Sequence, residues 1–251
     1  MNKYKLVSHN QHKLILLPTR FYKNQALLLI ASAIIFIMIS KASWIDLTIS
    51  RYWFDAVSQH FYLKDNVYLE LINHKLIKYG IIILYVGLLI KGIVQHQHQL
   101  QTVVLLAIVS VITVALLKQF SLHACPWSLT LFGGSEPYIP LLDFQTSTTG
   151  LALGRCFPGG HASAGFSLFA LVFLFKPNQR NRAIFLWVTV FIFGTLMGFG
   201  QVVRGAHFLT HNLWSAWWCW FSQVITYALL TEIFLRLKRW YQQRSSFASS
   251  L

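Results

Sequence analysis

The sequence predicts an all-α fold, an integral membrane bundle of six transmembrane helices with an outer-face loop region. Composition is the first reason, because the 251-residue chain is 55% hydrophobic and only 11% charged, whereas soluble domains average about 25% charged residues. The second reason is that the apolar residues gather in blocks near the roughly 17–25 residues that a helix needs to cross hydrocarbon. These blocks span about 26–40, 79–95, 101–117, 162–175, 183–203 and 213–235.

Each block supports a membrane helix over the alternative, a soluble all-helical core, because several runs contain no charged residue. The polar head before the first block is long for the n-region of a signal peptide, so we expect an uncleaved anchor. The chain shows no obvious internal repeat and no Gly/Ser linker. We therefore expect a basic cytoplasmic N-terminal segment (1–25), one membrane domain (26–236) and a cytoplasmic tail (237–251).

The net charge of +14 follows the predicted topology. With the N-terminus inside, 13 of the 21 Lys and Arg residues fall in inner segments, and six of the seven acidic residues fall in outer ones. This is the positive-inside bias of membrane proteins. We interpret the basic charge mostly as a consequence of the membrane topology, with some attraction to anionic lipid headgroups. We expect no nucleic-acid partner.

Two of the predicted outer loops are long. Residues 42–75 are rich in Trp, Tyr and Phe, which suits an interfacial helix or an ordinary loop with aromatic belt residues. Residues 119–160 are dense in Pro, Gly, Ser and Thr, which predicts a loop with at most short structure. The ionisable residues at the outer helix ends would share one membrane face. Placing them there costs free energy, which indicates that they have a function. They are Lys118, His161, Arg204 and His207.

The stretch PGGHAS, residues 158–163, has the composition of an anion-binding turn. Gly159 and Gly160 can bring backbone N–H groups close to an anion, and a helix beginning near Ala162 would add its positive dipole end. His161 stands at the rim, where it could give a proton to a leaving oxygen. The alternative is a Pro-Gly turn with a His that only caps a helix.

The stretch GQVVRGAHFLTHNLW, residues 200–214, supplies further candidates. If a helix begins near Gly205, His207 and His211 lie one turn apart on one face, and Arg204 precedes them on roughly the same side. A cation beside two imidazoles suits an anionic substrate and a His nucleophile. The alternatives are a membrane-interface cluster and a zinc site. Zinc is disfavoured because HFLTH lacks the Glu of zinc proteases and no Cys or carboxylate is an obvious further ligand, so we expect no metal.

With KQFSLHACP, residues 118–126, the three stretches together resemble the type 2 phosphatidic acid phosphatase family, which is related in fold to vanadium haloperoxidases. That family has the motifs Lys-x6-Arg-Pro, Pro-Ser-Gly-His and Ser-Arg-x5-His-x3-Asp. The matching residues are Lys118, Pro126, Pro158, Gly160, His161 and His207.

The resemblance implies a six-helix membrane enzyme that uses no cofactor, with the outer loops as its catalytic region. His207 would attack phosphorus to give a phosphohistidine, His161 would protonate the leaving group, and Lys118 would hold the phosphoryl oxygens. The substrate would be the phosphomonoester or diphosphate of a lipid in the bilayer. Undecaprenyl diphosphate or another isoprenyl diphosphate, phosphatidic acid, phosphatidylglycerol phosphate and lipid A phosphates all fit the family.

Two other functions stay open from the sequence. One is a phosphotransferase that passes the phosphoryl group to an acceptor lipid. The other is a membrane binding or scaffold protein that has lost catalysis. A haloperoxidase is disfavoured because that activity belongs to soluble relatives. The topology fits a bacterial inner membrane with the site facing the periplasm, and the oligomeric state is left open.

The sequence departs from the family motifs at four positions. Cys125, Gly159, Gln201 and His211 stand where the family has Arg, Ser, Arg and Asp. Arg204 lies three residues after the expected Arg, and Arg155 just precedes the second motif, so either arginine could replace a missing cation.

His211 raises a separate question, because the family Asp orients the nucleophile and stabilises its charge. A neutral His accepts the same hydrogen bond but supplies no negative charge. Asp143 or Glu136 in the second long loop could supply it. Alternatively, His211 is itself the nucleophile, separated from Arg204 by six residues, although the context around His207 matches the family better.

Cys125 and Cys156 bracket the second long loop, and in an oxidising periplasm they could pair. Closing that loop would contribute about 3–4 kcal/mol in the chain-entropy model, and it would hold the first motif near the second. Cys219 lies within the last predicted span, where we expect a small packing residue.

Overall fold

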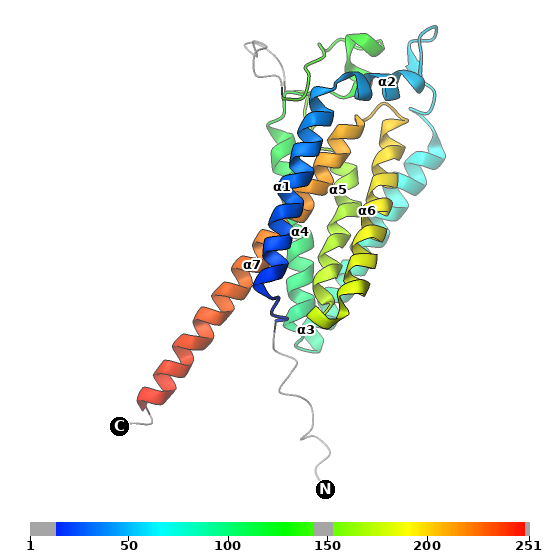
Figure 1. Ribbon diagram of the computed structural model, residues 1–251. Helices are drawn as coiled ribbons and strands as arrows, with labels where there is room; N and C mark the ends of the chain where they lie inside the picture. The colour runs from blue at the N-terminus through cyan, green and yellow to red at the C-terminus, as the bar shows by residue number, and fades with distance from the viewer. Residues whose placement is uncertain (1–13, 143–152, 249–251) are drawn as a thin grey trace.

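The computed structural model describes residues 14–142 and 153–248 of the chain, and this part is mostly helical (Figure 1). The elements in chain order are α1 (Thr19–Lys41), α2 (Trp44–Tyr52), β1 (Phe54–Asp55), β2 (His60–Phe61), η1 (Leu69–Leu76), α3 (Ile77–Val94), α4 (His98–Gln119), η2 (Pro126–Ser128), η3 (Thr130–Phe132), α5 (Gly160–Ser167), η4 (Leu168–Leu174), η5 (Pro177–Gln179), α6 (Arg180–Val202) and α7 (Leu209–Ala248). The predicted all-α fold is confirmed apart from the small β1–β2 hairpin.

Five helical segments are long and apolar enough to cross a membrane, which makes the chain an integral membrane protein. They are Thr19–Lys41, Leu69–Val94, His98–Gln119, Pro177–Val202 and Leu209–Leu237. The sixth expected span, 162–175, corresponds to a shorter apolar helix, Gly160–Leu174. The expected first span began too late, because the polar residues 19–25 form the first turns of α1.

The short segment α5–η4 lies at the centre of the bundle, packed against α4, α6 and α7 (Figure 1). Aromatic side chains mediate this packing. Phe169 of η4 stacks on Trp187 of α6, with ring centroids 5.2 Å apart. Glycine lets α6 come close, because a Cβ on Gly194 would lie 2.4 Å from the ring of Phe166. Close approach through small residues is typical of helix pairs in membranes, and here it fixes the position of α5.

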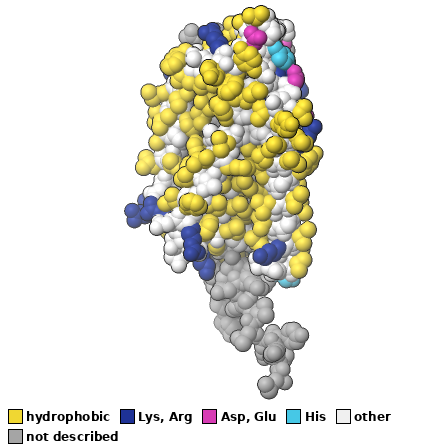
Figure 2. All heavy atoms as spheres, turned by 90° about the vertical axis from the view of Figure 1, so that its right-hand side faces the viewer, with side chains coloured by type: hydrophobic (Ala, Val, Ile, Leu, Met, Phe, Trp, Pro, Cys, Tyr) yellow, Lys and Arg dark blue, Asp and Glu magenta, His cyan; other side chains and the backbone are white. Residues whose placement is uncertain are grey.

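The flanks of the bundle are covered with exposed apolar side chains, while Lys and Arg lie toward its two ends (Figure 2). Ile83, Phe185 and Leu196 are each at least 65% exposed on helices long enough to span a bilayer. Such a wide apolar surface would be an aggregation liability in water. It is the surface expected of helices that face hydrocarbon.

The two long loops expected from the sequence pack together at the end of the bundle where α1 ends and α7 begins (Figure 1). The first contains α2 and the β1–β2 hairpin, in which Phe54 pairs with Phe61. The described parts of 119–160 contain the three-residue turns η2 and η3 and one isolated β-bridge, between Leu129 and Glu136, before α5 begins. A second apolar cluster joins both loops to the start of α7, and its buried members are Phe61, Ala124, Leu129, Phe132 and Phe208.

Candidate active site

The three stretches singled out in the sequence meet at the loop-covered end of the bundle. Lys118 lies in the last turn of α4, His161 lies in the first turn of α5, and His207 lies two residues before α7 begins. The C-terminal end of α4 and the N-terminal ends of α5 and α7 are neighbours in the packed bundle (Figure 1). We call this end of the molecule the site end.

Lys118, His161 and His207 form one cluster. The ring centroids of His161 and His207 are 6.0 Å apart. The ammonium nitrogen of Lys118 lies 3.5 Å from the point where a Cβ on Gly160 would sit, so it faces the first turn of α5. A cation beside the positive end of a helix is unfavourable unless an anion lies between them. The cluster therefore has the charge of an anion-binding site.

His207 is buried, with 2% of its surface exposed. Burial holds the pKa of its imidazole well below the usual range, and His211, Lys118 and His161 lower this pKa further. The ring is therefore uncharged at neutral pH. An uncharged imidazole has the free lone pair that a nucleophile needs.

The turn that carries His207 differs from the expected one. A helix was expected to begin near Gly205, but α7 begins at Leu209. The physical reason is that Gly205 adopts a left-handed conformation, with φ at +75°, which ends α6 in a tight turn. The N–H groups of Ala206 and His207 donate to the carbonyl of Gln201, at 2.9 and 3.3 Å.

His211 lies near His207 although the two do not share one helix. Their ring centroids are 6.0 Å apart, because the turn before α7 brings His207 back over the first turn of that helix. The expected proximity therefore arises from a loop followed by a helix. Nδ1 of His211 is buried and has no hydrogen-bond partner among the described residues.

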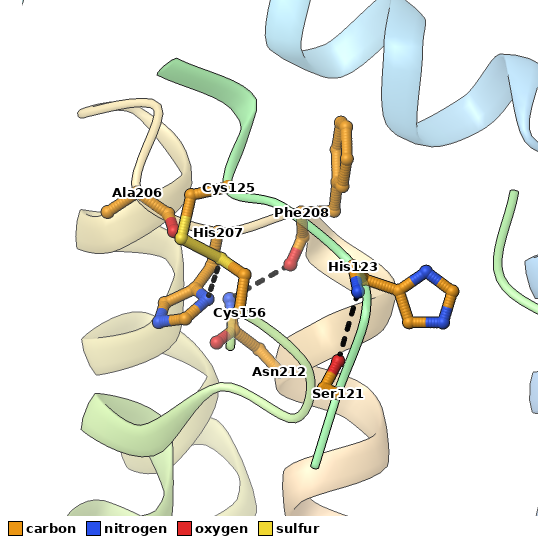
Figure 3. The surroundings of a disulfide bond; sticks show 8 residues. All are labelled: Ser121, His123, Cys125, Cys156, Ala206, His207, Phe208 and Asn212. Carbon is orange, nitrogen blue, oxygen red and sulfur yellow. Dashed lines mark hydrogen bonds between the residues drawn. A yellow bond between two sulfur atoms is a disulfide. The ribbon is translucent and has the colours of Figure 1, made fainter. Parts of the chain in front are cut away.

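Cys125 and Cys156 are joined in a disulfide, with their Cα atoms 5.2 Å apart. The bond holds the segment after α4 against the turn before α5, where Cys156 N–H also donates to the carbonyl of His123 at 2.9 Å. Sγ of Cys156 lies 3.2 Å from Nδ1 of His207 (Figure 3). A disulfide sulfur carries no proton, so only the imidazole can donate in this contact. Donation from Nδ1 leaves the lone pair on Nε2.

The sulfurs of Cys125 and Cys156 and a ring nitrogen of His207 lie within 4.8 Å of one another, a grouping that could suit a metal ion. A thiolate is the form of Cys that ligates zinc. In this structure both sulfurs are bonded to each other. The grouping is therefore explained by the disulfide beside the imidazole.

The two arginines considered as replacement cations lie apart from these contacts. Nε of Arg204 donates to the carbonyl of Lys64 at 3.0 Å, which directs it to the first long loop. Arg155 is exposed and has a positive φ of 49°. In the described part of the chain, Lys118 is the only Lys or Arg among the groups that shift the pKa of His207.

The second motif packs directly on α7, which explains one departure from the family pattern. A Cβ on Gly159 would lie 2.3 Å from Oδ1 of Asn212. Nδ2 of that buried Asn donates to the carbonyls of Gly198 and Phe208, at 3.0 and 3.3 Å. The residue at position 159 therefore has no room for the Ser side chain of the family motif.

His123 is a site residue that the sequence reasoning missed. Its ring centroid is 6.4 Å from that of His211, and Phe157 lies beside both rings. Burial lowers the pKa of His123, so its imidazole is also uncharged at neutral pH. Its place two residues before Cys125, in the stretch already singled out, was the available signal.

Asp46 in α2 was also missed. Its buried carboxylate accepts hydrogen bonds from the backbone N–H of Thr210, at 3.1 Å, and from the hydroxyl of the same residue. Burial raises the pKa of Asp46, and the hydrogen bonds from Thr210 act in the opposite direction. Asp46 also lines a small cavity with His123, Tyr138 and His211.

Asp143 and Glu136 were the two acids expected to compensate for the missing family Asp. Asp143 lies outside the described residues. Glu136 is half-buried, pairs through its backbone with Ser128 and Thr130, and forms no ion pair through its side chain with another described residue. Among the acids of the described residues, Asp46 is the one whose carboxylate accepts hydrogen bonds from the first turn of α7.

The comparison with protein families gives one match. The family model of the PAP2 superfamily matches residues 99–234, which is more than half of the chain and includes all three stretches of the site. No curated protein and no solved structure matches the chain.

Proposed function

The chain belongs to the PAP2 superfamily, and from this premise we propose that it is a membrane phosphatase that cleaves the phosphomonoester or diphosphate of a lipid. Membership supports a phosphatase-type activity on phosphate esters. The observation that carries the proposal is the cluster at the site end, in which the uncharged imidazole of His207 lies beside Lys118 and His161. A nucleophile, a proton donor and a cation are the groups that phosphoryl transfer through a covalent intermediate requires.

Binding of the phosphoryl group is assigned to Lys118 and the first turn of α5. The Lys118 ammonium faces Gly160, and the backbone N–H groups at this helix end point the same way as the helix dipole. A phosphate placed between them would be neutralised by the ammonium and would accept hydrogen bonds from the backbone. Gln201 adds a buried side-chain amide whose Nε2 has no partner among the described residues.

The first chemical step is attack by Nε2 of His207 on phosphorus. An N–P bond forms as the bond from phosphorus to the leaving oxygen breaks, and His161 gives that oxygen its proton. Contact of Nδ1 with the disulfide sulfur supports Nε2 as the attacking atom, because it leaves the lone pair there. A positive charge develops on His207 in this step. The Asp that stabilises this charge in the family is replaced by His211 in this chain.

The second step returns His207 to its starting form. Water attacks the phosphohistidine, the N–P bond breaks, and His161 takes the proton that the water loses. The products are inorganic phosphate and the lipid alcohol, or the lipid monophosphate when the substrate is a diphosphate. An acceptor lipid in place of water would make the chain a phosphotransferase.

A lipid substrate is supported by where the cluster lies. Lys118 ends a helix that is long enough to span a bilayer, so the cluster is close to the boundary between hydrocarbon and water. A headgroup could enter there while its tails stay among the exposed apolar side chains. Isoprenyl diphosphates such as undecaprenyl diphosphate, phosphatidic acid, phosphatidylglycerol phosphate and lipid A phosphates all present a terminal phosphate.

The sidedness of the membrane is part of the same proposal. The end of the bundle opposite the site carries Arg20, Lys23, Lys91, Lys176, Arg180 and Arg182. By the positive-inside rule this end is cytoplasmic, so the site faces the outside of the membrane. The disulfide fits an oxidising compartment such as the bacterial periplasm.

The test is phosphate release by the purified full-length chain in detergent, measured on a panel of lipid phosphates and diphosphates. His207→Ala, His161→Ala and Lys118→Ala should each lower release by at least about 100-fold. His98→Ala is the control, because His98 begins α4 at the end opposite Lys118. Release that appears only when an acceptor lipid is added would favour the phosphotransferase. No turnover under either condition would favour a scaffold.

A further inference from the structure

A groove runs between α1 and α6 at the end of the bundle opposite the site. Its volume is about 600 Å³, within the roughly 300–1,000 Å³ of small-molecule pockets. Residues of η4 and α7 form its floor, including Phe173 and Trp220. The groove is separate from the proposed active site, because Lys118, His161 and His207 lie at the site end and none of them lines it.

Three basic side chains from different segments converge on one end of the groove. Arg20 comes from the first turn of α1, Lys176 from the link after η4, and Arg180 begins α6. All three are exposed, and none forms an ion pair with an acid in the described part of the chain. Lys and Arg gather toward this end of the apolar surface (Figure 2). The groove therefore has an uncompensated positive mouth.

The lining becomes apolar away from that mouth. Leu28 lies eight residues after Arg20, and Val188 lies eight residues after Arg180. At 1.5 Å per residue, each step is about 12 Å along its helix. Trp187 lies beside Val188 on the same wall. The groove therefore changes from cationic to apolar along the direction in which the helices cross the membrane.

We propose that this groove binds an anionic phospholipid, with the phosphate at Arg20, Lys176 and Arg180 and an acyl chain along the apolar part. Charge complementarity selects this occupant, because three cations without an acidic partner favour a headgroup with net negative charge. Basic pockets between transmembrane helices bind such headgroups in other membrane proteins. A zwitterionic headgroup would bring its own cation close to the three present.

The bound lipid would join parts of the bundle that meet at the groove. α1 packs against α7, and a headgroup held by Arg20 and Arg180 would tie its first turn to α6 as well. Binding to the folded state alone raises stability by mass action. The lipid is thus expected to stabilise the bundle without taking part in the reaction.

The test measures lipid binding by the purified full-length chain, by native mass spectrometry and by the shift in melting temperature. The probes are dioleoyl phosphatidylglycerol, dioleoyl phosphatidylcholine and inorganic phosphate. The triple variant Arg20→Gln, Lys176→Gln, Arg180→Gln should bind phosphatidylglycerol at least tenfold more weakly than the wild type. The control removes the same charge outside the groove, through Lys23→Gln, Lys91→Gln and Arg182→Gln, and should bind like the wild type.

Leu28→Trp gives a second test that leaves the charges in place, because it fills the apolar part of the groove and should also weaken binding. Equal binding of the two phospholipids, or equal loss in both triple variants, would overturn the proposal. A full melting-temperature shift with inorganic phosphate alone would also overturn it, because no acyl chain would then be needed. These readouts need no catalysis, so their outcome is independent of the proposed phosphatase activity.

Discussion

The carboxylate of Asp46 caps the first turn of α7 by accepting hydrogen bonds from both the backbone N–H and the hydroxyl of Thr210. Thr210 lies between His207 and His211, so an acid from α2 holds the turn on which the two imidazoles depend. A negative charge at a helix N-terminus is also favoured by the helix dipole. Asp46 thus supports the position of these imidazoles from a different part of the chain than the family Asp.

Asp46→Ala is expected to destabilise the protein by about 1–3 kcal/mol, because it leaves buried donors on Thr210 without an acceptor. It should also lower kcat roughly tenfold while KM changes little, because the nucleophile loses its position and the phosphate ligands do not. Melting curves and steady-state kinetics measure both effects.

Asp55→Asn is the control, because the half-buried Asp55 carboxylate accepts hydrogen bonds from Val57 N–H and from the hydroxyl of Ser58, within its own turn. Thr210→Ala should act on the same interaction, so its combination with Asp46→Ala should cost less than the sum of the single changes. Full additivity would show that the cap does not couple the two residues.

Gly159→Ser restores the family motif, yet we expect it to lower stability and phosphate release. The new Cβ would lie 2.3 Å from Oδ1 of Asn212, and moving that buried amide would break its two hydrogen bonds. The expected cost is about 1–3 kcal/mol. Melting temperature and phosphate release measure the effect.

Two further variants sharpen that prediction. Adding Asn212→Ala to Gly159→Ser should recover part of the lost stability, since it removes the colliding atom. Gly87→Ser should be near neutral, because nothing lies within 4 Å of a Cβ there. Wild-type stability in Gly159→Ser alone would contradict the packing described for this turn.

Reduction of the Cys125–Cys156 disulfide should lower both stability and activity. The bond closes a loop with a sequence separation of 31 residues, and the chain-entropy model gives about 3–4 kcal/mol for a loop of this size. Activity should fall because the bond also holds Cys156 against His207. Melting curves and kinetics with and without dithiothreitol test this, with Cys219→Ala as the control. A reductant effect that persists in Cys125→Ser, Cys156→Ser would point to another cause.

The stability and the activity of the protein are expected to depend on pH, because the pKa of His207 is lowered in the folded chain. The unfolded chain takes up this proton near the usual histidine pKa of about 6.5, whereas the folded chain resists it until a lower pH. The unfolded state therefore binds more protons below about pH 6.5, and stability falls as the pH falls through that range. The acidic limb of kcat/KM should also lie below about pH 6.5, because the free enzyme keeps the nucleophile unprotonated.

Melting temperatures between pH 7.5 and 5 check the stability arm of this prediction. His207→Gln should lose less stability on acidification than the wild type, because Gln takes up no proton. His98→Gln is the control at the other end of the bundle. His123 has a lowered pKa as well, so part of the slope should remain in His207→Gln.

The bundle was largely predictable because crossing hydrocarbon leaves a local signal, an apolar run of fixed length. Five expected spans correspond to helices that can cross a membrane. The span around 162–175 is shorter, because η4 ends at Leu174 and Lys176 and Pro177 follow at once. The meeting of Lys118, His161 and His207 was also predictable, since each lies at or next to the end of a helix on one face.

The rest of the site depends on contacts between distant segments, which leave no periodic signal in the sequence. Asp46 reaches Thr210 across 164 positions, and only the folding of the first long loop brings them together. His123 gains its place from the same loop packing. The start of α7 was misplaced because Gly205 was assigned to a helix, whereas its left-handed conformation makes a turn.

The most direct test of the central claim is to trap the covalent intermediate on His207. The wild type is mixed with a ³²P-labelled lipid phosphate that it turns over and is quenched within milliseconds, and the labelled site is mapped by mass spectrometry. We predict an acid-labile, alkali-stable phosphoryl group on His207, present in His98→Ala and absent in His207→Ala. Label on His211 with His207 unmodified, or turnover that persists in His207→Ala, would contradict the account.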